Sequence, residues 1–301
     1  MISDIYKNRS RSFIVFPMML IGIIPAIAFY FGFWEFKFDY QLRMTFLSHD
    51  PNILSYNLLF AYIFTLYFFN FDNFKWITKY SSIFIISGFY GVPIFATLSR
   101  TALAAFCLIF VLYILFAESI KLYKFLAFFL AFIIVTTVVI KLANYDPVSA
   151  FTERVSEGDN TRTDFLAAAI KVVGNNFFTG VGLANFGDKQ WRISNGFFMR
   201  LDGQIVQTSS HIGMLDILMI GGIFFLLAII YLLLFPTLKI YKRRQSCGKN
   251  DFYLDRFLTI SVFTTFIVIN LTYSSYMSKT AWTSVTLLYV LTNKYLRVRQ
   301  A

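Results

Sequence analysis

Three side chains that can carry positive charge stand where the sequence predicts the start of a helix. Arg100 follows Ser99, Arg162 opens a short amphipathic stretch, and His211 follows Thr208-Ser209-Ser210. Serine and threonine are common helix caps, and a helix N-terminus attracts anions through its unpaired N–H groups and its dipole. An arginine adds a rigid fork of donors that matches phosphate oxygens. Two such arginines could hold a pyrophosphate and stabilise it as a leaving group without a metal ion.

His211 is the candidate general base. The field at a helix N-terminus disfavours a protonated imidazole, so we expect a neutral ring that can accept a proton. Asp216 follows within the same apolar run, where a charged group is costly and often functional. It lies roughly 140° around an ideal helix from His211, so the two side chains need not touch. A structural role for Asp216 in the bundle is as well supported as a catalytic one. His49, the other histidine, is assigned no role.

Each of these residues also has a simpler interpretation. Arg100 could be an interfacial arginine whose charged end reaches the lipid headgroups. Arg162 could be a solvated loop charge that pairs with Asp164 or Glu157. His211 could be a histidine whose ring makes only structural hydrogen bonds. The functional interpretation therefore depends on the elements that hold the three residues.

These elements are predicted membrane spans. Of the 301 residues, 57% are apolar and 14% are charged, against roughly 45–50% and about 25% in soluble domains. This composition excludes a disordered, fibrous or ordinary soluble protein, and the positions of the two cysteines exclude a disulfide framework. Eight runs reach or approach the roughly 20 residues that a spanning helix needs. They are residues 13–34, 53–71, 81–98, 101–117, 125–143, 212–235, 257–276 and, weakest, 280–292.

The charges sort by loop and give the orientation. Alternating the eight spans leaves one set of loops, including both termini, with 16 Lys and Arg and 5 Asp and Glu residues. The opposite set has 11 Lys and Arg against 10 Asp and Glu residues. Cytoplasmic loops carry the excess of Lys and Arg, so both termini are predicted to be cytoplasmic. The net charge of +11 is then an orientation signal and implies no nucleic-acid partner. Arg100, Arg162 and His211 all fall on the outer side.

One outer loop, residues 144–210, is much longer than the others. A long loop in a compact protein often carries function. Thr161 and Asp164 have the spacing of a capping box, which predicts a helix that starts at Arg162 and includes the amphipathic stretch 163–173. Gly180 and Gly182 are expected to be turn residues and do not form a dinucleotide-binding fingerprint. The loop's aromatic residues fit either a glycan groove or anchors at the membrane surface.

Taken in order, these pieces resemble the O-antigen ligase / O-antigen polymerase family of bacterial membrane glycosyltransferases. Ser99-Arg100-Thr101-Ala102-Leu103 resembles the family's first arginine motif. Arg162 with an apolar helix, then 176–182 (NFFTGVG) and Asn185-Phe186, resembles its loop signature. The stretch 211–223 (HIGMLDILMIGGI) resembles its histidine motif. The resemblance covers residues 95–225, and the chain departs from the family at Ile212, where an asparagine is frequent, and in having fewer spans.

The resemblance implies an all-α, polytopic transmembrane bundle of the GT-C type with about eight spans. The chain would be one integral membrane domain, residues 1–301, with the periplasmic loop 144–210 carrying short helices. It would act on the periplasmic face of the bacterial inner membrane, on a glycan linked to undecaprenyl pyrophosphate, without a metal or other cofactor. Arg100 and Arg162 would bind the pyrophosphate and His211 would activate or orient the acceptor hydroxyl. Asp216, Gly180, Gly182 and Asn185 are candidate supporting residues.

Several activities fit this resemblance. A polymerase, which joins lipid-linked repeat units and has a chain-length regulator protein among its implied partners, is preferred on the small size and divergent motifs. A ligase, which transfers the finished glycan to lipid A-core, and a protein O-glycosylating enzyme are alternatives. From other classes, a polysaccharide or lipid transporter would show internal repeats and midplane charges, which are not evident here. A non-catalytic scaffold would tolerate His211→Ala.

Overall fold

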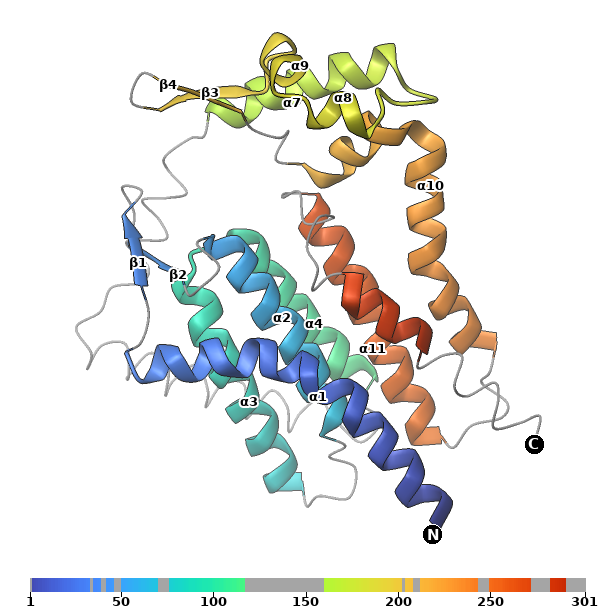
Figure 1. Ribbon diagram of the computed structural model, residues 1–301. Helices are drawn as coiled ribbons and strands as arrows, with labels where there is room; N and C mark the ends of the chain where they lie inside the picture. The colour runs from blue at the N-terminus through green and yellow to red at the C-terminus, as the bar shows by residue number, and fades with distance from the viewer. Residues whose placement is uncertain are drawn as a thin grey trace.

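The structure is a computed structural model of the chain, which describes residues 2–32, 35–38, 42–45, 50–69, 76–116, 160–201, 204–207, 212–242, 249–271 and 282–290. The described residues are mostly helical. They form a bundle of long helices with a smaller layer of short helices across one of its ends, which we call the cap (Figure 1).

The bundle consists of long helices. Its members are α1 (Ile2–Tyr30), α2 (Pro51–Phe68), α3 (Trp76–Ala96), α4 (Arg100–Phe116), α10 (Gly213–Lys242) and α11 (Lys249–Asn270). Most of them run in alternating directions, while the second half of α1 lies across α2 and α3 (Figure 1). Helices α2, α4 and α10 begin, and α3 and α11 end, at the end of the bundle nearest to the cap (Figure 1). Residues 282–290 are also helical, and Tyr289 donates a hydrogen bond to the Leu232 carbonyl of α10 at 2.6 Å.

Helix α2 forms the centre of the bundle. Its start is fixed by Asp50, whose side chain accepts from the Asn52 N–H at 2.7 Å, and by Pro51 in the first turn. Most of its side chains are buried on all sides, between α1, α3, α4 and α11. A helix that is apolar around its whole circumference can be stable only when it is surrounded in this way or lies in lipid.

Two pairs of buried hydroxyl groups are hydrogen-bonded inside the bundle. The Tyr62 hydroxyl contacts the Ser87 hydroxyl at 2.8 Å, and the Thr65 hydroxyl contacts the Tyr90 hydroxyl at 2.8 Å. Both pairs join α2 to α3, and all four residues are largely buried. A buried hydroxyl without a partner is costly, so these pairs allow polar side chains to remain in an otherwise apolar core.

The eight-span count remains a prediction. One helix in the described part of the chain, Gly213–Pro236, is both long and apolar enough to cross a membrane, and Val15–Tyr30 and Arg100–Leu115 are shorter apolar helices. The predicted spans 53–71, 81–98 and 257–276 overlap α2, α3 and α11, which are helical as expected. The predicted span 125–143 lies outside the described residues.

The cap is built from the long loop. It contains α7 (Asn160–Asn175), α8 (Leu183–Gly187), α9 (Lys189–Ser194) and a hairpin of β3 (Phe198–Leu201) and β4 (Gln204–Gln207). The predicted amphipathic helix 163–173 is present within α7. Its buried positions Phe165, Ala169 and Val172 follow helical spacing. Ala169 and Val172 belong to the cap's apolar core.

Two antiparallel hairpins were not predicted from the sequence, which indicated helices throughout. One is β3–β4, and the other joins β1 (Glu35–Phe38) to β2 (Leu42–Thr45). In the first, Leu201 pairs with Gln204, so only Asp202-Gly203 connects the strands. Asp-Gly is a strong signal for a two-residue hairpin turn. The long apolar runs dominated the sequence pattern, so the short strands between them were not predicted.

Candidate functional site

The feature that connects the cap to the bundle is a break in α10. The backbone leaves the helical conformation at Gly222, where φ is 66° and ψ is −167°. This region of backbone space is open essentially only to glycine. The helix consequently has a short first segment, residues 213–221, which lies across the end of the bundle, and a long second segment that runs along it (Figure 1).

The loop 177–182 fills the break with backbone hydrogen bonds. The Val181 and Gly182 N–H groups donate to the carbonyls of Met219 and Ile220 at 2.7 and 2.9 Å. The Ile223 N–H donates to the Phe177 carbonyl at 2.8 Å. In an unbroken helix the Met219 carbonyl would accept from Ile223. The loop therefore satisfies the groups that the break exposes, as buried backbone groups require.

Glycines make this contact possible on both sides. A Cβ added at Gly222 would collide with the Phe178 carbonyl and lie 2.7 Å from the Thr179 nitrogen. A Cβ added at Gly180 would lie 2.6 Å from the Gly221 nitrogen, and φ at Gly180 is +67°. Gly182 also has a positive φ, +83°, but the space around it is open. The prediction that Gly180 and Gly182 are turn residues is confirmed. Their contact with the break in α10 at Gly222 was not predicted from the sequence.

The first segment of α10 lies between two apolar clusters. Met219 and Ile220 pack with Phe186 and Phe197 of the cap. Ile217 packs into the main core of the bundle instead. Asp216 is fully buried in the first turn of α10 and makes an interaction within the protein. Whether its role is structural or catalytic stays a prediction.

Arg100 is the first residue of α4, as the sequence predicted. A tight turn joins α3 to α4, and in it Leu98 has a φ of +51°, which is unusual for a bulky residue. The Ser99 carbonyl accepts the first helical hydrogen bond, from Leu103 at 3.0 Å, which places Ser99 at the N-cap. Ser99 is buried while the Arg100 side chain is exposed. A fixed backbone thus presents an exposed arginine at the end of the bundle where α4 begins.

Arg162 lies in the first turn of α7, and its side chain is outside the described residues. The helix begins at Asn160, so the predicted start at Arg162 with a Thr161 cap is wrong by two residues. The segment Gly158-Asp159-Asn160-Thr161 offers three consecutive cap-type residues, and spacing alone could not choose among them.

His211 lies just outside the described residues, and α10 begins at Gly213. The Ile212 carbonyl accepts from the N–H groups of Leu215 and Asp216 at 3.0 and 3.1 Å, which makes Ile212 the N-cap. Convergence of Arg100, Arg162 and His211 on one pyrophosphate therefore stays a prediction. What the structure does bring together is α7, which carries Arg162, and α10, which His211 precedes.

Asn185 has a local structural role in α8. Its Nδ2 donates to the Val181 carbonyl at 2.9 Å, which stabilises the turn that contacts α10. Within the ranges that the structure describes, no group of His, Cys, Asp and Glu side chains could hold a metal ion. A metal-independent reaction stays a prediction.

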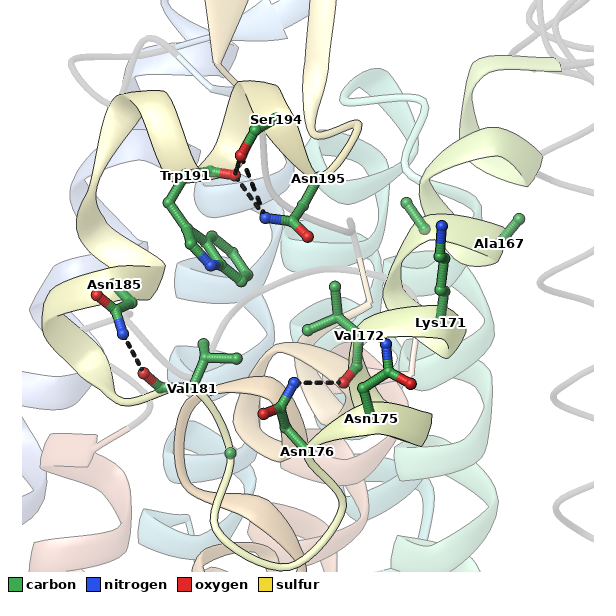
Figure 2. A pocket seen from close by; sticks show the side chains of 12 residues that line it. Ala167, Lys171, Val172, Asn175, Asn176, Val181, Asn185, Trp191, Ser194 and Asn195 are labelled. Atoms are coloured by element: carbon green, nitrogen blue, oxygen red, sulfur yellow. Dashed lines mark hydrogen bonds between the residues drawn. The ribbon is translucent and has the colours of Figure 1, made fainter.

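A cavity of about 750 Å³ lies between α7 on one side and α8 and α9 on the other (Figure 2). Gly180 and Val181, which belong to the loop docked on α10, also line it. The cavity was not predicted from the sequence. Trp191 and several asparagines of the long loop are visible in the sequence, but their proximity depends on how the loop folds.

Comparison with known proteins identifies the segment that contains these features. Residues 83–230, almost half of the chain, match the family model described as O-antigen ligase. The matched segment includes Arg100, Arg162 and His211, the loop 177–182 and the break in α10. No curated protein and no solved structure matches the chain. The resemblance predicted from the three motifs is thereby confirmed over residues 83–230, which are similar to the O-antigen ligase family.

Proposed function

We propose that this protein is a membrane glycosyltransferase that polymerises oligosaccharide repeat units linked to undecaprenyl pyrophosphate. The family match supports transfer of a glycan from a lipid carrier. In this proposal the reaction occurs on the periplasmic face of the bacterial inner membrane. The acceptor hydroxyl attacks the anomeric carbon, its proton passes to a base, and the bond to the pyrophosphate breaks.

One observation carries the proposal: the loop 177–182 is bonded through its backbone to the break in α10. This contact joins the loop that follows α7 to α10, at the end of the bundle where α4 begins (Figure 1). Arg100 opens α4, Arg162 lies in the first turn of α7, and His211 precedes α10 in the sequence. Such an arrangement suits binding and activation of one anionic lipid headgroup.

Exposed aromatic residues support a membrane surface at this level. Phe177 and Phe178 of the loop and Phe224 and Phe225 of α10 are all exposed, and Phe178 lies against Phe224 with ring centroids 6.4 Å apart. Large exposed apolar side chains gathered at one place indicate contact with lipid or a partner. A lipid contact here would hold the break in α10 near the headgroups of the outer leaflet.

The roles proposed for the three residues follow from their chemistry. Arg100 and Arg162 would bind the pyrophosphate and stabilise the charge that develops on it as it leaves. His211 would accept the proton of the acceptor hydroxyl or orient that hydroxyl. Asp216 would support the first turn of α10, three residues after its first helical position.

The test uses membranes that contain the protein and a lipid-linked repeat unit, with products separated by size. A polymerase gives a ladder of growing glycans. Arg100→Ala, Arg162→Ala and His211→Ala are each expected to abolish the ladder while the protein remains in the membrane. His49→Ala is the matched control for His211, and Lys189→Ala, an exposed cation on α9, is the control for the arginines. Ladders of normal length from all three variants would refute the proposal.

A ligase is the second candidate, because the matched family model is described as O-antigen ligase. A ligase would transfer a finished glycan to lipid A-core and would make no ladder from repeat units alone. Adding lipid A-core to the same membranes separates the two activities. Transfer only to lipid A-core would replace the polymerase with the ligase and leave the residue roles unchanged.

A further inference from the structure

The cavity of the cap has a mixed lining that suits a sugar. Its volume of about 750 Å³ lies within the roughly 300–1,000 Å³ typical of small-molecule sites. The twelve lining residues include one tryptophan, four asparagines, one serine and one lysine, and no acidic residue. Sugars present apolar C–H faces between hydroxyl groups that both donate and accept, so they need an aromatic surface next to neutral amides.

Trp191 supplies the aromatic surface. It is half-buried on α9, and Figure 2 shows its indole directed into the space between α9 and α7. The ring is held by Phe197, stacked with centroids 6.2 Å apart, and by Phe186 at 6.3 Å. This inward position distinguishes Trp191 from the exposed Phe177 and Phe178. A pre-oriented indole can stack on the C–H face of a sugar ring, because the C–H groups are polarised toward the negative face of the aromatic system.

Three asparagines supply amides in fixed orientations. Asn176, Asn185 and Asn195 each donate from Nδ2 to the carbonyl of the residue four positions earlier, at 3.1, 2.9 and 2.9 Å. In the described part of the chain, no hydrogen bond uses their Oδ1 atoms. Each amide is thereby held by the backbone and keeps its Oδ1 as an acceptor for a ligand. Asn176 and Asn185 also keep one N–H each, whereas the Asn195 amide donates in addition to Ser194 Oγ at 3.4 Å. A sugar hydroxyl can donate to these oxygens and accept from the remaining N–H groups.

Lys171 supplies the charge. It projects from α7, on the wall opposite Trp191 (Figure 2), and it is the one charged residue among those that line the cavity. Its side chain is exposed at the rim. Since no carboxylate lines the cavity to neutralise it, the lysine favours a ligand that brings its own negative charge.

We propose that this cavity is a subsite for a sugar ring of the glycan and that it prefers an acidic sugar, such as a hexuronate. The proposal rests on the glycan-transferring function proposed above. Gly180 and Val181 line the cavity and also dock on the break in α10. A glycan held here would therefore lie beside the loop that docks on the break in α10.

The test is binding of glycans that carry no lipid or pyrophosphate. The full chain in nanodiscs is applied to an array of bacterial surface oligosaccharides that includes acidic and neutral repeat units. Wild type is expected to bind a subset enriched in uronate-containing glycans. Trp191→Ala should weaken binding to all of them by roughly tenfold or more, because it removes the stacking surface. Trp191→Phe should retain most of the binding.

Lys171 gives a test that does not depend on the fold of the cap, because its side chain is exposed. Lys171→Glu should weaken binding of acidic glycans by about tenfold and leave neutral ones nearly unchanged. Gln190→Ala is the matched control, since Gln190 is an exposed amide on α9 that does not line the cavity. Its binding should equal that of wild type.

Three results would overturn the subsite: no binding by wild type to any glycan, equal binding by Trp191→Ala, or equal loss of acidic and neutral glycans in Lys171→Glu. The outcome is separable from that of the proposed function. Arg100→Ala should lose transfer and keep glycan binding. If the array results fail while Arg100→Ala still abolishes the ladder, the subsite is wrong and the glycosyltransferase stands. If glycans bind through Trp191 but wild type transfers nothing, the proposed function is wrong.

Discussion

The bundle and the cap are stabilised in different ways. In the bundle, long helices satisfy their own backbone, and apolar side chains fill the space between them. In the cap, helices of five and six residues are joined by loops, and backbone groups of the loop 177–182 bond to backbone groups of α10. The bundle therefore depends on side-chain volume, whereas the cap depends on backbone geometry at a few glycines.

This difference explains where the candidate site lies. A packed helical bundle tolerates exchange of one apolar residue for another of similar volume. A glycine that faces another backbone at close contact tolerates no side chain at all. The residues at the break in α10 are thus fixed by a constraint that the rest of the apolar run 212–235 does not have. Substitutions that test each region separately should show this directly.

The largest effect is expected for Gly222→Ala. The added Cβ would collide with the Phe178 carbonyl, and the backbone conformation at Gly222 is unsuitable for alanine. Together these should destabilise the docked loop by roughly 3 kcal/mol or more. Hydrogen exchange should become faster at the amides of Val181, Gly182 and Ile223, and glycan transfer should be lost. The melting temperature of the bundle should change much less.

Unchanged exchange at those three amides would contradict a cap held by this contact. Gly180→Ala is a second probe from the opposite side, since its Cβ would lie 2.6 Å from the Gly221 nitrogen. It should produce the same pattern of faster exchange. Agreement between the two variants would locate the effect at the contact between loop and helix.

A substitution in the bundle should lower the melting temperature and leave hydrogen exchange in the loop 177–182 unchanged. Ser87 donates to the Ile83 carbonyl at 2.7 Å, so the Tyr62 hydroxyl donates to Ser87. Ser87→Ala would leave the buried Tyr62 hydroxyl without its acceptor, at a cost of about 1–3 kcal/mol. The melting temperature in detergent should fall, while exchange at Val181 and Gly182 should stay as in wild type.

The double variant Tyr62→Phe with Ser87→Ala is the control for that prediction. It removes both hydroxyls, so no buried donor is left unpaired, and it should recover most of the lost stability. A double variant as unstable as Ser87→Ala alone would show that packing, not the hydrogen bond, sets the contribution of this pair.

The same contrast explains what the sequence could predict. Continuous apolar runs and the spacing of Phe165, Ala169 and Val172 gave the long helices and α7, because these patterns are local. The break in α10 was missed although Gly221-Gly222 stands within the run. Two adjacent glycines weaken a helix, but only the non-local contact with the Phe178 carbonyl makes one of them indispensable.

The candidate site divides in the same way. Arg100 at the start of α4 followed from a cap residue beside an apolar run, which is a local signal. The cavity did not, because Trp191, Asn176 and Lys171 become neighbours only when α9 and the turn after α7 fold against each other. The hairpin β3–β4 had a local signal in Asp202-Gly203. Such Asp-Gly pairs can be searched for in the short polar segments between apolar runs.

The smallest effects are expected for two glycines where an added Cβ would meet no other atom, so that backbone strain can be measured without a steric collision. Gly182 has a φ of +83° but open space around it, whereas Gly174 in α7 has open space and no positive φ. Gly182→Ala should destabilise the cap by about 1 kcal/mol, from backbone strain alone. Gly174→Ala should stabilise α7 by up to about 1 kcal/mol, because alanine is the better helix former. Hydrogen exchange across α7 and the loop measures both. If Gly182→Ala slows exchange as Gly174→Ala should, the left-handed turn is not required for docking, and the cap would be held by its apolar cluster instead.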